Sequence, residues 1–228
     1  MKTDAMAVDA ARAGADPVFD RCWWLYSLCR ERLFADHTET IVTALAPLLR
    51  SRPRLQLVEL GCGPGFYSRR LAARFPCVQA IGIDTSERLL SHARVQASRA
   101  HLDNCQFLQR DAQQLCDCAE TADVAIASRF FLVLAQREQV LRVIFETLRP
   151  GGLFFVAEPL SPFRTAVPLW LMRAVDTMNG RDLDPDSQVH CNVLSHEQFV
   201  QLMGAAAWSK VALWRDKRYQ YALCEKAS

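Results

Sequence analysis

The residues best placed to do chemistry form a short glycine-rich loop. The apolar run 55–60 predicts a buried strand, which leads into Glu-Leu-Gly-Cys-Gly-Pro-Gly (59–65) and then into a helix. Glycine lacks a Cβ, so a backbone rich in it can turn sharply and come close to a ligand. The first turn of the following helix has free N–H groups. This strand–loop–helix unit predicts a cofactor site.

The spacing of the loop separates the classes of cofactor. A dinucleotide loop has the pattern G-x-G-x-x-G, whereas here the glycines are Gly61, Gly63 and Gly65, and Phe66 holds the sixth position. No Gly-Lys-Ser/Thr follows, which excludes a phosphate loop of the nucleoside-triphosphatase type. Glu59 precedes the first glycine by two residues, and its carboxylate favours a cation over a pyrophosphate. S-adenosylmethionine (SAM), which carries a sulfonium and an ammonium group, fits this charge.

The segment LVELGCGPGFYSRRLA (57–72) resembles the first motif of class I SAM-dependent methyltransferases. Segments 81–94, 107–115 and 122–159 agree with the later motifs in order and spacing, so the resemblance covers roughly residues 55–160. It is closest to the small-molecule branch that includes the ubiquinone and menaquinone biosynthesis methyltransferases. The resemblance implies an α/β, Rossmann-like fold with a seven-stranded, mostly parallel sheet and helices on both faces. It places the last strand antiparallel, between the fifth and the sixth.

The resemblance also assigns cofactor contacts. Asp84 ends the second strand and would bond the ribose hydroxyls, while Asp111 and Ala112 would contact the adenine. Glu59 would face the ammonium group of SAM, although a strand-end carboxylate satisfied by the protein itself stays open. A role for Asp111 as the cap of a turn also stays open. The other residues expected at the cofactor are Gly61, Cys62, Gly63, Gly65, Thr85 and Ser128.

Methyl transfer places few demands on catalytic side chains. The sulfonium carries the driving force, and the protein supplies orientation and a dry pocket. A base is needed only where the acceptor still holds its proton. We expect Tyr26, Arg129 and His190 on the acceptor side, with structural roles open for each. Glu158 and His196 are further candidates for a base.

The residues after the fourth strand argue against two substrate classes. Methyltransferases that act on amino groups of nucleobases or glutamine carry an Asn-Pro-Pro-Tyr-like motif there, whereas this chain has Ala-Ser-Arg-Phe (127–130). The resemblance therefore favours a small-molecule acceptor. Two alternatives stay open: a SAM-binding accessory or regulatory protein without turnover, and a methyltransferase that acts on protein or RNA.

The elements that must position these residues alternate along the chain. Apolar runs predict strands at 55–60, 78–83, 105–109, 123–127 and 153–157, with helices at 66–75, 86–100 and 137–148 between them. A helix at 195–203 and a hairpin of 210–214 with 219–224 follow. Such alternation predicts a parallel sheet with right-handed crossovers.

Two segments lie outside this alternation. We expect residues 1–50 to be a tail and a helical lid, with 17–50 helical, and 51–228 to be the SAM-binding domain with a substrate-lid insertion at 159–194. These two segments carry many large apolar side chains, which predicts a small and largely apolar or aromatic acceptor. They include Trp23, Trp24, Phe163, Trp170 and Met172.

Composition limits the partners and the compartment. The chain has 228 residues, a net charge of +2 and no long basic run, so we expect no DNA partner. The nine cysteines are an odd number and the first residues lack the apolar core of a signal peptide, which favours reduced thiols in the cytoplasm. Cys116 and Cys118 have no second pair at zinc-site spacing, so we expect no metal. We also expect no transmembrane segment, and we leave a homodimer open.

Overall fold

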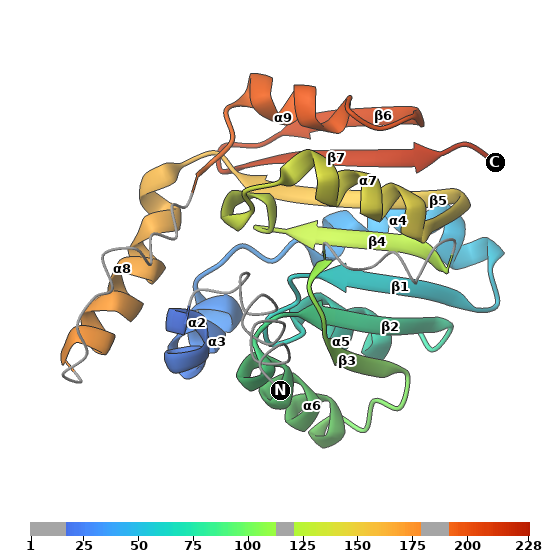
Figure 1. Ribbon diagram of the computed structural model, residues 1–228. Coiled ribbons are helices and arrows are strands. Elements are labelled where there is room, and N and C mark those ends of the chain that lie inside the picture. Colours follow the sequence, from blue (N-terminus) through green and yellow to red (C-terminus); the bar gives the residue numbers. More distant parts are fainter. Residues whose placement is uncertain (1–16, 113–120, 179–191) are drawn as a thin grey trace, which may run out of the picture.

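A single seven-stranded sheet organises the chain (Figure 1). The computed structural model describes residues 17–112, 121–178 and 192–228. The strand order is β3-β2-β1-β4-β5-β7-β6, in which β1 to β5 pair in parallel and β7 is antiparallel to β5 and β6. The expected topology is therefore confirmed. The strands are β1 (Leu55–Leu60), β2 (Val78–Asp84), β3 (Cys105–Gln109), β4 (Ala122–Ser128), β5 (Leu148–Pro159), β6 (Trp208–Arg215) and β7 (Tyr219–Lys226).

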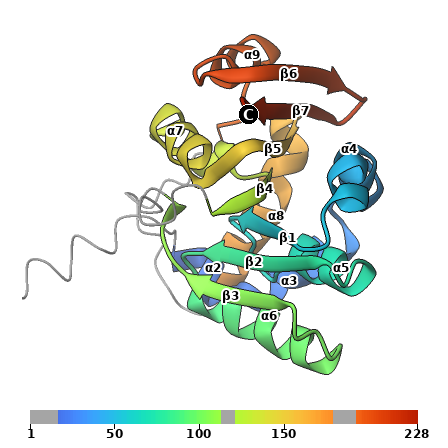
Figure 2. The same ribbon diagram turned by 90° about the vertical axis from the view of Figure 1, so that its right-hand side faces the viewer.

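Helices cover both faces of the sheet, as Figure 2 shows from its edge. One face carries α4 (Thr38–Ser51) and α5 (Phe66–Arg74), and the other carries α7 (Arg137–Thr147) and α9 (His196–Met203). The helix α6 (Glu87–Arg99) packs against the edge strand β3. Ser86 is its N-cap, because the Ser86 hydroxyl accepts a hydrogen bond from the N–H of Leu89. None of the helices within the described ranges has the length and hydropathy of a membrane span.

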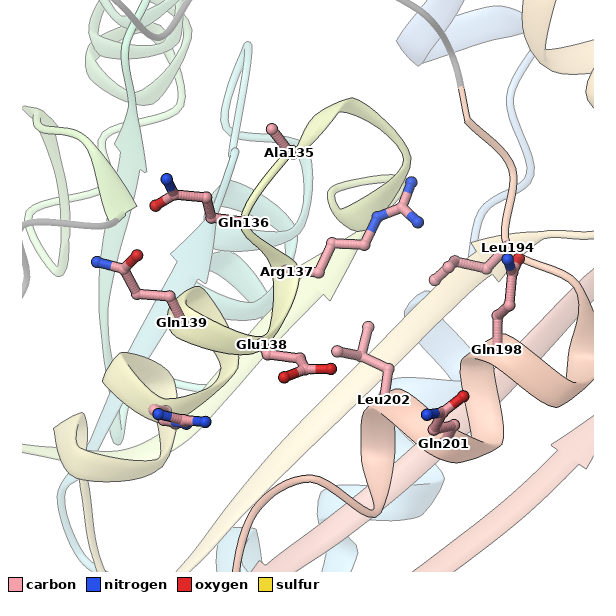
Figure 3. A pocket seen from close by; sticks show the side chains of 10 residues that line it. Ala135, Gln136, Arg137, Glu138, Gln139, Leu194, Gln198, Gln201 and Leu202 are labelled. Carbon is pink, nitrogen blue, oxygen red and sulfur yellow. The ribbon is translucent and has the colours of Figure 1, made fainter.

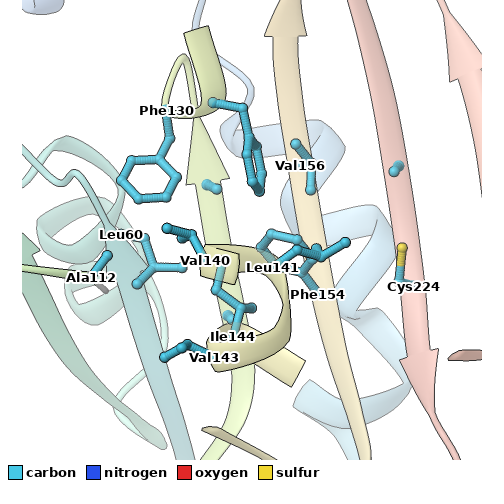
Figure 4. Close-up of a cluster of buried hydrophobic side chains, with 14 of the residues drawn as sticks. Leu60, Ala112, Phe130, Val140, Leu141, Val143, Ile144, Phe154, Val156 and Cys224 are labelled. Carbon is cyan, nitrogen blue, oxygen red and sulfur yellow. The ribbon is translucent and has the colours of Figure 1, made fainter. Parts of the chain in front are cut away.

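The two sheet faces have separate hydrophobic cores because side chains alternate along each strand. In β1, Leu55 and Leu57 belong to the core beneath α4 and α5, whereas Val58 and Leu60 belong to the core beneath α7. Figure 4 shows this second core, where the side chains of α7 meet those of β1, β4 and β5. A strand buried on both faces has to be apolar almost throughout, which is why its sequence alone identified it.

The remaining helices lie beyond the carboxyl ends of β1 and β4 (Figure 1). They are α2 (Pro17–Arg21), α3 (Trp23–Arg32) and α8 (Pro162–Met178). Met172 of α8 is buried against Val18 and Cys22, and Arg21 forms a 2.6 Å ion pair with Asp176. The N-terminal helices and the insertion therefore pack together as one cover. Trp170, in contrast, is 68% exposed on α8.

The region expected to be helical throughout residues 17–50 is divided into three helices. The chain leaves α3 at Leu33 and enters α4 at Thr38. Asp36 stabilises the start of α4, because its Oδ1 accepts the backbone N–H of Thr38 at 2.9 Å and also the hydroxyl of Thr38. A carboxylate that satisfies a free N–H group favours a helix start over a continuous helix. The apolar periodicity did not contain this signal.

Asp123 ties β4 to two neighbouring segments. Its side chain is 1% exposed and accepts the N–H of Gln56 at 2.7 Å, while Arg52 and Arg149 approach it at 2.5 and 3.1 Å. The two guanidinium groups are partly exposed to water, whereas the carboxylate is buried. If the interactions were lost, the free-energy cost would come mainly from the buried carboxylate, which water cannot solvate.

We predict that Asp123→Ala lowers the free energy of unfolding by about 1–3 kcal/mol, because it leaves the Gln56 N–H buried without an acceptor. Urea denaturation measures this quantity. Glu39→Ala is the control, because it removes the ion pair with Arg74 in which the Glu39 side chain is 79% exposed. An exposed pair contributes less than about 1 kcal/mol. Equal losses in the two variants would contradict the role of Asp123.

Candidate cofactor-binding and active site

The glycine loop lies where the order of the strands reverses. β1 pairs with β2 on one side and with β4 on the other, and open α/β sheets bind ligands beyond the strand ends at this point. Gly65 has a φ of 70° and begins α5, and a Cβ there would lie 2.3 Å from Cε1 of Phe107. Only glycine fits this position, so the loop can turn directly into the helix.

Asp84 holds the loop from the end of β2. Its Oδ2 accepts the N–H of Gly63 at 2.8 Å and its Oδ1 accepts the N–H of Ser86 at 2.9 Å. Burial raises the pKa of Asp84, and these N–H bonds oppose the rise. The carboxylate therefore sits at the loop, as expected for a group that meets a ribose, while it also orders the loop itself.

Glu59 satisfies the start of α5. It is 4% exposed, and its Oε2 accepts the N–H of Ser68 at 2.7 Å and the hydroxyl of Ser68 at 2.6 Å. Its Oε1 lies 3.4 Å from the N–H of Tyr67. Burial raises the pKa of Glu59. This geometry supports the structural role left open from the sequence, and the contact with an ammonium group stays a prediction.

Tyr26 of α3 lies directly over the loop. A Cβ on Gly63 would be 3.0 Å from Cε1 of its ring. The ring also packs edge-on against Phe19, with centroids 5.3 Å apart. Burial raises the pKa of Tyr26 to about 12, although Arg129 and Arg30 lower it. At neutral pH the phenol therefore keeps its proton, so it can donate a hydrogen bond but is a poor base.

Arg129 follows β4 in a strained conformation. Its φ is 57°, in the left-handed region that disfavours a side chain, and its N–H donates to the carbonyl of Ala157 at 2.9 Å. The guanidinium lies 4.1 Å above the ring of Phe34. Strained residues cluster at functional sites, which supports the expected position of Arg129 beside the acceptor.

Glu158 lies at the end of β5, next to this turn. It is 2% exposed, and its Oε1 accepts the N–H groups of Phe130 and Phe131 at 2.7 and 2.9 Å. Burial raises the pKa of Glu158 to about 7, against the effect of those two N–H bonds and of nearby Arg129. The carboxylate thus positions the turn that carries Arg129.

The other expected residues are distributed unevenly. Ser128 is half-buried at the end of β4 and lowers the pKa of the Tyr67 phenol, while burial raises it. The carbonyl of Thr85 accepts the side-chain amide of Gln109 at 3.0 Å. Cys62 is buried among α6 and β3, so it can reach a cofactor only through its backbone. His190 lies outside the described residues. Asp111 is half-buried, Ala112 is buried and His196 is exposed. The six cysteines in the described ranges are all free thiols.

Sequence reasoning missed Arg30 and His37. Arg30 is 6% exposed and stacks 3.7 Å above Phe66, and His37 is 3% exposed beside Tyr67. Arg30 follows Tyr26 by four residues and so shares its helix face. An arginine inside an apolar stripe was the available signal, but periodicity alone treats it as part of a core.

Figure 3 shows a hollow between α7 and α9. Most of its lining is polar and includes Gln136, Gln139, Gln198 and Gln201. It contains none of the residues expected to bind the cofactor. Among the described residues, no group of three or more His, Cys, Asp or Glu side chains could hold a metal ion.

We predict that Glu158→Gln becomes more stable relative to the wild type as the pH rises from 5 to 8. The folded protein raises the pKa of Glu158 from 4.5 to about 7, so the stability from this group is complete below pH 4.5 and is lost as the pH rises through 7. The relative gain should reach about 3 kcal/mol, because one pKa unit corresponds to about 1.4 kcal/mol.

Urea denaturation at several pH values measures this difference. Glutamine keeps an oxygen that can accept the N–H groups of Phe130 and Phe131, so the turn should persist. Glu138→Gln, at an exposed position on α7, is the control for replacing a carboxylate by an amide. A difference between Glu158→Gln and the wild type that stays constant with pH would disprove the assignment.

Comparisons with known proteins agree with this geometry. Residues 57–152 match the family model described as a methyltransferase domain. The chain is 33% identical over 126 residues to a trans-aconitate 2-methyltransferase of Deinococcus radiodurans, covering 55% of this chain and 46% of that enzyme. It is 31% identical over 175 residues to a protein of the same name from Variovorax paradoxus, covering 76% and 64%. The chain thus spans about half the length of most of the curated relatives it matches.

A solved SAM-dependent methyltransferase from Aquifex aeolicus superimposes with a TM-score of 0.60 at 15% identity, covering 88% of this chain and 96% of that one. At this identity the likeness concerns the fold. The family match identifies residues 57–152 as a methyltransferase domain, within a fold that this solved SAM-dependent methyltransferase shares.

Proposed function

We propose that this protein transfers the methyl group of SAM to an oxygen, nitrogen or carbon nucleophile of a small molecule. The observation that carries the proposal is the glycine loop at the strand-order reversal, with the Asp84 carboxylate bonded to the N–H of Gly63. This places a carboxylate and a side-chain-free backbone at one point, as a nucleoside with a cationic tail requires.

The residues present fit SAM. The loop presents bare backbone at Gly63, where a Cβ would lie 3.0 Å from Cε1 of Tyr26, so glycine allows the ring to lie this close to the loop. Asp84 would hold the ribose, Asp111 and Ala112 the adenine, and the loop the methionine part. When bound, SAM supplies the electrophilic methyl group. The chain orients the acceptor, and the helices α2, α3 and α8 keep water away from it.

The side chains around the loop suit positioning better than proton removal. The Tyr26 phenol keeps its proton, because burial raises its pKa to about 12. It can therefore donate a hydrogen bond to the acceptor and hold it in line with the sulfonium. Glu158 has a pKa of about 7, but its Oε1 is occupied by two backbone N–H groups. An acceptor that ionises by itself would need no base.

The lining of the site supports an acceptor with an apolar or aromatic body. Phe19, Tyr26 and Phe34 form a connected set of rings over the loop. The curated relatives are named for trans-aconitate, an acid, and that name suggests a charged group on such an acceptor as well.

The accessory-protein alternative predicts SAM binding without turnover, and the macromolecular alternative predicts a basic surface around the site. Incubating the protein with methyl-labelled SAM and fractionated cell extract separates the three. Label in small molecules supports the proposal, label in protein or RNA supports the second alternative, and binding without transfer supports the first.

We predict that Asp84→Asn lowers the affinity for S-adenosylhomocysteine (SAH) about 10- to 150-fold. The substitution removes the charge from hydrogen bonds worth roughly 1.5–3 kcal/mol, while its side-chain oxygen can still accept the N–H of Gly63. Calorimetry measures the affinity, and thermal unfolding checks that the loop persists. Glu87→Gln is the control, because this carboxylate in the first turn of α6 is 47% exposed and pairs with Arg94. Unchanged affinity in a folded Asp84→Asn variant would refute the assignment.

A further inference from the structure

Arg30 is a buried cation without a charged partner. It is 6% exposed, its Nη1 donates to the carbonyl of Ala35 at 3.4 Å, and its Nη2 has no hydrogen-bond partner in the part of the chain that the structure describes. Its guanidinium lies between the rings of Phe66 and Tyr67, at 3.7 and 4.7 Å from their centroids. Burying a guanidinium is costly unless an anion compensates it. Among the described residues, Arg30 lowers the pKa of Asp36 and of Glu59, but it forms an ion pair with neither.

Arg129 is a second cation close enough to Tyr26 to lower its pKa. Its guanidinium packs on Phe34 and has no hydrogen bond or ion pair with any residue in the described ranges. Both Arg30 and Arg129 lower the pKa of Tyr26, which lies against Gly63 of the loop. Both also lower the pKa of His37, which burial brings to about 4, so that imidazole is neutral at pH 7. At pH 7 the positive charge near Tyr26 and His37 is therefore carried by Arg30 and Arg129.

The nearby carboxylates are engaged elsewhere. Glu59 accepts N–H and O–H groups at the start of α5, Glu158 accepts the N–H groups of the two residues after Arg129, and Asp84 holds the loop. Each is close enough to affect the pKa of a neighbouring group, yet none forms an ion pair with Arg30 or Arg129 among the described residues. Their hydrogen bonds fix them at helix starts, so they cannot turn toward the guanidinium groups.

We propose that Arg30 and Arg129 together bind a carboxylate group of a ligand beside the methyl donor. The proposal rests on the proposed function and specifies its substrate chemistry. A planar carboxylate matches the two parallel N–H donors of a guanidinium, and the aromatic rings beneath both arginines hold those donors in place. The carboxylate has two sources, the methionine part of SAM and the acceptor, and both would meet the arginines in front of Tyr26.

Calorimetry with matched probes distinguishes the sources. SAH carries the methionine carboxylate, and 5′-methylthioadenosine lacks it. Benzoate, malonate and tricarballylate, each added to protein saturated with SAH, represent acceptors. The variants are Arg30→Gln and Arg129→Asn, the latter because asparagine tolerates the left-handed backbone at that position.

We expect each variant to lose about 10- to 100-fold in affinity for one carboxylate source, as expected for charge-assisted hydrogen bonds. Weaker SAH binding with unchanged methylthioadenosine binding assigns the arginines to the cofactor. Unchanged SAH binding with loss of a carboxylate that the wild type binds assigns them to the acceptor. The proposal is overturned if SAH binding is unchanged and the variants bind every carboxylate as the wild type does, including the case in which the wild type binds none.

Arg70→Gln is the matched control. Arg70 lies 4.2 Å above Phe66, so it contacts the same ring as Arg30, but it is 45% exposed and paired with Asp36. Its loss should leave all the affinities unchanged. Arg30→Lys keeps the positive charge and most of the apolar part of the side chain. If Arg30→Lys regains part of the affinity that Arg30→Gln loses, the loss comes from binding and not from misfolding. If the wild type binds neither nucleoside, the proposed function fails, and the same carboxylates added to the protein without SAH then decide on the arginine site.

Discussion

The site depends on how the protein satisfies the backbone N–H groups where helices and turns begin beside the ends of parallel strands. Such groups have no partner within their own helix, and leaving one buried and unpaired costs about 1–3 kcal/mol. Three strand-end carboxylates meet this requirement: Glu59 for α5, Asp84 for the loop and α6, and Glu158 for the turn after β4. Their hydrogen bonds give the loop and the turn one geometry.

This constraint also sets the charge of the site. Because the carboxylates are held by N–H groups, they do not neutralise Arg30 and Arg129, whose guanidinium groups rest on aromatic rings instead. Stacking on a ring orients a guanidinium without occupying its N–H donors in the ring plane. Asp84 thus places a negative charge at the loop, while Arg30 and Arg129 lie close enough to Tyr26 to lower its pKa.

The helical cover adds a second level of organisation. Residues 17–32 and 162–178 are far apart in the sequence, yet Met172 packs on Val18, and Arg21 pairs with the buried Asp176. A half-buried ion pair fixes the relative position of two helices more than it stabilises them. The N-terminal helices, of which α3 carries Tyr26, are therefore linked to α8. A movement of α8 would shift Tyr26 relative to the glycine loop.

The sequence by itself determined the sheet, because strands buried on both faces must be apolar and the helices between them show their periodicity. Strand order needed more than periodicity, and it came from the resemblance. The loop was readable because Gly61, Gly63 and Gly65 are close in sequence, and Asp84 was readable because it ends a strand. Glu158 could be named but not given a role, since its partners lie 27 and 28 residues away.

Only the tertiary structure decided which side chains meet at the loop. Tyr26 could be expected near the methyl group, but Arg30 could not be distinguished from the apolar stripe that contains it. Its environment comes from α5, through Phe66 and Tyr67, and its lack of an ion pair within the described ranges shows only when the carboxylates there have been located. Local sequence patterns indicate which residues are buried and where the chain turns. The pairing of charges depends on distances between elements, and these are set by packing.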